Sequence, residues 1–106
     1  MANPVQIENI EAMRRQQGIE DVELREVVSR LVVGDVVVLT LLSGTDGSAG
    51  ETVRVRITFI KGSVFRGKLL RKPISVGLKQ LRVGAPLAFS ASHIHSVPKM
   101  QPVQVQ

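Results

Sequence analysis

Residues 53–69 read VRVRITFIKGSVFRGKL, and this stretch determines the predicted fold. Apolar and polar side chains alternate over residues 53–60, which is typical of a strand with one buried face. A turn over residues 61–63 leads to a second alternating run over residues 64–69. The two runs therefore predict an antiparallel hairpin.

The apolar pattern also predicts the register of this hairpin. A three-residue loop, residues 61–63, would pair Phe59 with Phe65 and keep one face of the hairpin apolar. A two-residue loop would instead place Phe59 opposite Arg66. We therefore expect the three-residue loop, with Gly62 supplying a positive φ.

Further strands are expected before and after the hairpin. Residues 36–42 are rich in β-branched side chains and apolar on both faces, which predicts a central strand. The small residues at 43–50 predict a loop that leads into the hairpin. Pro86 places an expected strand over residues 86–89 toward a sheet edge, and residues 94–97 predict one more short strand.

Two helices are expected in the N-terminal part of the chain. Asn3-Pro4 is typical of a helix start, and Gly18 can end that helix. Asp21 can cap a second helix. The apolar residues of this second helix recur at helical spacing: Leu24, Val27, Val28 and Leu31.

Together these elements predict a mainly β protein with N-terminal helices, of the α+β class. We expect a small SH3-like β-barrel or half-barrel of about five strands, preceded by two short helices that pack on an open end or side. Residues 1–31 would form the helical segment, residues 32–97 the barrel and residues 98–106 a flexible tail, in one folded unit.

Composition excludes several classes of protein. The chain has 106 residues, 43% of them hydrophobic, and no Cys. Without Cys there are no disulfides, thiolate nucleophiles or Cys-based zinc sites, which fits a cytoplasmic protein. No secretory signal is expected at the N-terminus. The longest apolar stretch is shorter than the roughly 20 residues that span a bilayer, so no membrane association is predicted.

The stretch over residues 53–94 resembles a family of uncharacterised bacterial small β domains, a domain of unknown function. The residues that carry the resemblance are Ile57–Gly62, Phe65–Leu69, Pro73, Leu81–Gly84, Phe89 and Ile94. The chain departs from the family in lacking a Trp in the first strand, and in having Ala85 where the family has an acid. Because the family has no established function, the resemblance implies a fold and no activity.

Charge is divided unevenly between the two halves of the chain. Residues 1–51 hold four Arg and all nine acidic residues, a formal charge of −5, whereas residues 52–106 hold ten Lys or Arg and no acid, a charge of +10. This asymmetry indicates that the second half binds an anionic partner, or that it packs against the acidic first half of the same or another copy. A solvated basic face without any partner is the third interpretation.

The predicted hairpin gathers part of this positive charge. Its register places Arg56 opposite Lys68, and like charges directly opposite are destabilising by roughly 0.2–1 kcal/mol. A phosphate backbone could offset them. The candidate polyanion site comprises Arg54, Arg56, Lys61, Arg66, Lys68, Arg71 and Lys72. Base stacking is not expected, because the chain has no Trp or Tyr and its three Phe are predicted to face the core.

A second candidate site surrounds His93 and His95. If residues 93–95 are a strand, both imidazoles lie on one face, but a zinc site needs three or four ligands. Ser90 and Ser92 are close in sequence, but no acid marks a catalytic Ser-His pair. We therefore predict no catalytic residues, no metal ligands and no cofactor.

These observations favour a non-enzymatic module for protein–protein interaction or self-association, with an unknown protein or a second copy as partner. The alternative is nucleic-acid binding through the basic face of the sheet. A small hydrolase or metal site around His93 and His95 is the third hypothesis.

Overall fold

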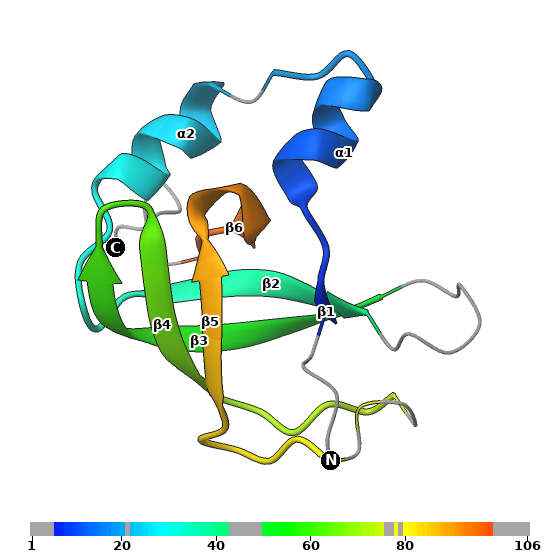
Figure 1. The fold of residues 1–106 in the computed structure, drawn as a ribbon, viewed down its shortest axis with the longest axis vertical. Coiled ribbons are helices and arrows are strands. Elements are labelled where there is room, and N and C mark those ends of the chain that lie inside the picture. Colours follow the sequence, from blue (N-terminus) through cyan, green and yellow to red (C-terminus); the bar gives the residue numbers. More distant parts are fainter. Residues whose placement is uncertain (1–5, 21, 43–49, 76–77, 79, 99–106) are drawn as a thin grey trace, which may run out of the picture.

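The computed structural model describes residues 6–20, 22–42, 50–75, 78 and 80–98 (Figure 1). The predicted cap residues Asn3 and Asp21, most of the loop after residue 42 and nearly all of the predicted tail lie outside this described part. Within it, no helix is long and apolar enough to cross a membrane.

The described strands form one antiparallel sheet that nearly closes into a barrel. The strands are β1 (Gln6–Ile7), β2 (Val36–Leu42), β3 (Glu51–Lys61), β4 (Val64–Leu69), β5 (Pro86–Ser90) and β6 (Ile94–Ser96). Their order is β1-β2-β3-β4-β5, and β6 returns to pair with β2. This arrangement, preceded by two helices, confirms the predicted fold class.

Strand β2 is central, as its two-sided apolar pattern predicts. It pairs with β3 on one side and with β1 and β6 on the other. Val37, Leu39 and Leu41 are fully buried. They belong to a core cluster that receives inward-facing residues from every strand from β2 to β6, because successive side chains of a strand point to opposite faces of the sheet.

The first helix begins later than the sequence predicts. Helix α1 spans Ile10–Gln16, and the side chain of Asn9 caps it by accepting a hydrogen bond of 2.9 Å from the N–H of Ala12. Ile7, expected in this helix, lies in β1 opposite Leu41. Gly18 has a φ of 77°, so it ends the helical turn in the left-handed conformation that the sequence predicts.

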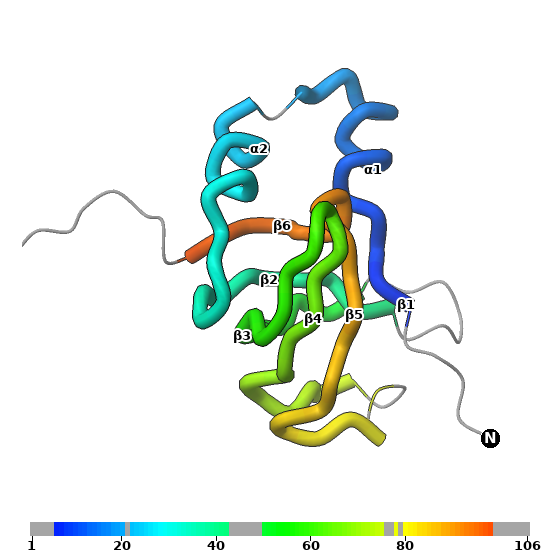
Figure 2. The backbone as a smooth tube through the Cα atoms, turned by 60° about the vertical axis from the view of Figure 1, so that its left-hand side comes forward, coloured from blue at the N-terminus to red at the C-terminus, as the bar shows by residue number. Residues whose placement is uncertain are grey.

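Both helices lie at one end of the barrel (Figures 1 and 2). Helix α2 spans Val22–Ser29, and its apolar residues Leu24, Val27 and Val28 pack against the core cluster. Helix α1 contacts η2, the 3-10 turn at Ala91–His93 that separates β5 from β6. The predicted position of the helices on an open end is therefore confirmed.

The predicted register of the central hairpin is wrong near its turn. Lys61 pairs with Val64, so the loop is the two residues Gly62-Ser63, and Gly62 has a φ of 61°. The register shifts by one residue between Ile57 and Phe59. This shift is a β-bulge, and it compensates for the shorter loop. From Ile57 back to Val55, the strand therefore keeps the predicted pairing.

Because of the bulge, one aromatic ring that is predicted to face the core, that of Phe59, lies on the outer face instead. Phe59 pairs with Arg66 on the outer face and is 42% exposed. Phe65 and Phe89 are each 4% exposed and stack in the core, with ring centroids 5.5 Å apart. The prediction that all three Phe face the core is therefore wrong for Phe59 and confirmed for Phe65 and Phe89.

Gly67, the glycine of the Phe-x-Gly-x-Leu motif, allows β3 and β4 to approach closely. A Cβ atom at this position would clash with the side chain of Val55 and lie 2.6 Å from the carbonyl oxygen of Arg56. A glycine inside a strand often marks such a contact.

Candidate polyanion-binding face

The outer face of the β3–β4 hairpin carries the cations that the sequence singles out. Arg54 and Arg56 alternate with buried residues on β3, and Arg66 and Lys68 do the same on β4. All four are exposed. Arg56 pairs directly with Lys68, as predicted, whereas Arg66 pairs with Phe59 because of the bulge.

Further cations extend this face at both ends. Lys61 is exposed at the end of β3, next to the turn of the hairpin, and Arg71 and Lys72 are exposed shortly after the end of β4. Arg71 and Lys72 share with Arg54 the lining of a hollow of about 500 Å³. We call the whole set the basic band: Arg54, Arg56, Lys61, Arg66, Lys68, Arg71 and Lys72.

Within the described part of the chain, no residue of the basic band is ion-paired. The Arg56 guanidinium donates a hydrogen bond of 3.2 Å to the carbonyl oxygen of Gly34. The Arg66 guanidinium lies over the Phe59 ring, 5.3 Å from its centroid. These contacts orient two side chains of the band but leave their positive charge uncompensated.

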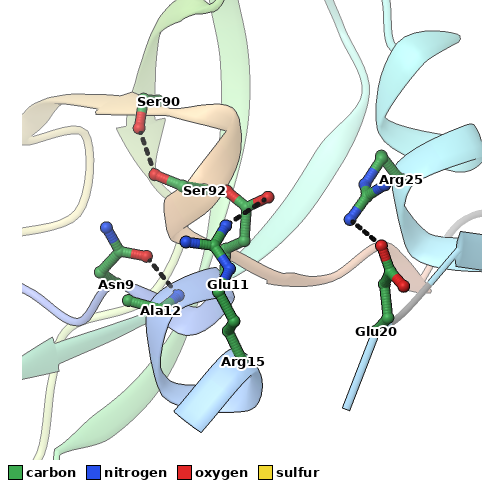
Figure 3. A network of polar contacts seen from close by, with 8 residues as sticks. All are labelled: Asn9, Glu11, Ala12, Arg15, Glu20, Arg25, Ser90 and Ser92. Carbon is green, nitrogen blue, oxygen red and sulfur yellow. Dashed lines mark hydrogen bonds and ion pairs between the residues drawn. The ribbon is translucent and has the colours of Figure 1, made fainter. Parts of the chain in front are cut away.

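Acids in the helical segment pair with that segment's own arginines. Glu11 lies 3.5 Å from Arg15, and Glu20 lies 3.6 Å from Arg25 (Figure 3). Both pairs are exposed and contribute little to stability. In the described structure, Glu11 and Glu20 therefore neutralise two arginines of the helical segment and not the basic band.

Glu51 lines the hollow beside Arg54 but is engaged elsewhere. Its carboxylate oxygens accept hydrogen bonds of 2.8 Å from the N–H groups of Ile74 and Ser75. Partial burial alone would raise the pKa of Glu51. The hydrogen bonds from Ile74 and Ser75 outweigh burial and lower that pKa. Glu51 is therefore ionised near neutral pH and fixes the segment after the band.

A second hollow, of about 420 Å³, lies between α1, α2 and η2. Ile10, Leu24 and Ile94 supply apolar surface there, and Arg15 and Arg25 lie on its lining. Both of these arginines are ion-paired with acids of the same hollow. Its lining is therefore mixed in charge, and its two ion-paired arginines differ in this respect from the cations of the basic band.

The two histidines do not share one strand face. His93 ends the 3-10 turn η2, whereas His95 lies in β6. The Nδ1 atom of His93 accepts a hydrogen bond of 3.0 Å from the N–H of Ser90 and lies 3.2 Å from the Ser90 hydroxyl oxygen. This contact caps the turn. Among the described residues there is no group of three or more His, Asp or Glu that could hold a metal ion.

Phe59 is the residue of this face that sequence reasoning misses. The structure places its ring between Lys61 and Arg56 along the outer face, opposite Arg66. The available signal was Gly62-Ser63, because Gly followed by Ser is typical of a two-residue hairpin loop. That loop brings Phe59 opposite Arg66.

No protein-family model, no curated protein and no solved structure matches this chain. The resemblance to a family of bacterial β domains therefore stays a prediction.

Proposed function

We propose that this chain is a non-enzymatic, cytoplasmic binding module whose basic band binds the phosphate backbone of nucleic acid. One observation carries the proposal: seven exposed cations follow one hairpin and its continuation, and no acid of the described chain is paired with any of them. A partner with closely spaced negative charges would remove the repulsion between neighbours such as Arg56 and Lys68.

Phosphate contact would make binding strongly dependent on salt. Each neutralised phosphate releases counterions, so the logarithm of affinity falls linearly with the logarithm of salt concentration. If about five cations contact phosphates, a fourfold rise in salt lowers the affinity about 100- to 500-fold.

The strand order is compatible with this function. The meander β2-β3-β4-β5, the 3-10 turn and the return of β6 to β2 support our assignment of the barrel to the SH3-like architecture. Small barrels of other kinds, such as the OB-fold, bind oligonucleotides on an exposed sheet face. This support is an analogy of architecture, and the charge of the band remains the stronger argument.

Single charge removals test the proposal. We expect Arg54→Ser and Lys68→Ser each to weaken binding of a fluorescent oligonucleotide in an anisotropy titration. Each should also reduce the salt slope by about 0.7 for a single strand or 0.9 for a duplex, because one phosphate contact is lost.

The matched control is Arg30→Ser, which removes the same charge from an exposed position beyond the end of α2. It should leave the salt slope unchanged. If Arg30→Ser reduced the salt slope as much as Arg54→Ser and Lys68→Ser do, overall charge, and not the basic band, would govern binding.

Self-association is a second candidate, favoured by the exposed acids near α2. Glu20, Glu23 and Glu26 are exposed, and none of them is paired with the basic band of the same molecule. They could cover the band of a second copy, in a head-to-tail contact between different surfaces. A sedimentation coefficient that rises with protein concentration for the wild-type chain, and rises less for Lys68→Ser, would support this function. A coefficient independent of concentration would argue against it.

A further inference from the structure

The β-bulge between Ile57 and Phe59 moves an aromatic ring onto the basic band. Without it, the alternation of β3 would direct Phe59 to the same face as Val55 and Ile57, which are buried. With it, Phe59 lies opposite Arg66 and keeps 42% of its surface exposed. The other aromatic residues of the chain, Phe65 and Phe89, are buried, so Phe59 is the one exposed aromatic ring.

The ring and the guanidinium beside it form a small stacking surface. The Arg66 guanidinium lies over the Phe59 ring, 5.3 Å from its centroid, and makes a cation–π contact with it. Both groups are planar and are side chains on which unpaired bases stack in other nucleic-acid-binding proteins. Val64, the nearest exposed apolar side chain on β4, has no planar group to offer.

Cations flank this stacking surface along the hairpin. Lys61 lies beyond Phe59 toward the turn, and Arg56 with Lys68 lies beyond it in the other direction. Residues two apart on a strand are separated by about 6.5 Å. A base stacked on Phe59 would therefore have cations within reach of the phosphates on both sides of it.

We propose that the basic band takes single-stranded nucleic acid, with one base stacked on Phe59 and Arg66. This inference rests on the proposed function and adds the class of nucleic acid. A duplex keeps its bases stacked on each other and offers the ring nothing, whereas a single strand can turn a base out onto it. Every base has a flat face, so the stacking itself carries little sequence preference.

The test compares oligonucleotides of equal charge with and without bases. The probes are a fluorescent single-stranded DNA of about 12 nucleotides, the RNA of the same sequence, and a DNA strand of the same length in which all sites are abasic. We expect the wild-type chain to bind the base-bearing strands about 5- to 150-fold more tightly than the abasic strand. A higher affinity for the RNA would identify the 2′-hydroxyl as a further contact and support single-stranded binding equally.

Phe59→Leu removes the ring but keeps an apolar side chain. We expect it to reduce the affinity for the base-bearing strands to that for the abasic strand, and to leave abasic binding unchanged. Val64→Ala, on the same face, should change neither affinity. Because the wild-type comparison needs no variant, the inference is tested even if Phe59→Leu fails to fold.

Two results would overturn the inference in different ways. Equal wild-type affinities for base-bearing and abasic strands, with a steep salt dependence for both, would leave backbone binding in place and reject stacking on Phe59. No binding of any of these single-stranded probes at about 50 mM salt, where phosphate contacts are strong, would reject the inference, and no binding of a duplex under the same conditions would reject the proposed function as well.

Discussion

At the scale of single residues, the contact between Ser90 and His93 shows how a turn depends on one protonation state. The N–H of Ser90 donates to Nδ1 of His93 at 3.0 Å, which requires that this nitrogen carry no proton. His93 is partly buried, and burial lowers its pKa because desolvation disfavours the charged ring.

This contact predicts a loss of stability in acid. Because the pKa of His93 is lower in the folded chain than in the unfolded chain, the unfolded state takes up the proton first. The contribution of the neutral ring is therefore complete above pH about 6.5 and is lost as the pH falls through the folded value. The free energy of unfolding, measured by urea titration from pH about 7.5 to 5.5, should decrease for the wild-type chain.

His93→Gln removes the titrating group and should flatten this decrease. His95→Gln leaves the contact between Ser90 and His93 intact, so the free energy of unfolding of this variant should still decrease as the pH falls. A decrease of the same size in the His93→Gln variant would show that other groups cause the acid sensitivity.

At the scale of elements, the β3–β4 hairpin determines both the core and the basic band. Its two-residue loop and its bulge act together, because the slip introduced at Gly62-Ser63 is absorbed before Ile57. Phe65 therefore stays in the core while Phe59 moves to the outer face.

Alanine substitutions at the two rings test this register. Phe65→Ala should lower the free energy of unfolding by about 3–5 kcal/mol, because it opens a cavity in the core. Phe59→Ala should lower it by about 1 kcal/mol or less, because only an exposed contact with Arg66 is lost. Urea unfolding of both variants gives the comparison, and losses of equal size would support the three-residue loop instead.

The sequence predicts those parts of the fold in which local pattern and burial agree. The bounds of β2 follow from its continuous apolar, β-branched run, and the faces of β3 before the bulge and the position of the α2 apolar residues follow from periodicity. The pairing of Arg56 with Lys68 follows too, because it lies on the far side of the bulge from the turn.

The missed features depend on contacts that no local pattern contains. Both Asn3 and Asn9 are good cap residues, and the pairing of Ile7 with Leu41 in the sheet excludes Ile7 from the helix. The bulge likewise depends on the loop and the core together, so the outer position of Phe59, and with it the stacking surface, could not be derived from alternation alone.

At the scale of the whole molecule, the ion-paired acids of the helical segment are separate from the basic band, although β2 of the acidic half pairs with β3 and Glu51 lines a hollow with Arg54. The described ion pairs stay within the helical segment at one end of the barrel, and the basic band remains exposed on the β3–β4 hairpin. A separation of this kind leaves the positive field of the hairpin available to an anionic partner.

The most direct test of the account is an NMR amide titration with a short single strand and with a duplex, at about 50 and 200 mM salt. We predict shifts that cluster on the residues of the basic band, include Phe59 for the single strand, and fade steeply at the higher salt concentration. An absence of shifts at the lower salt concentration, or shifts confined to the hollow between α1 and α2, would contradict the account.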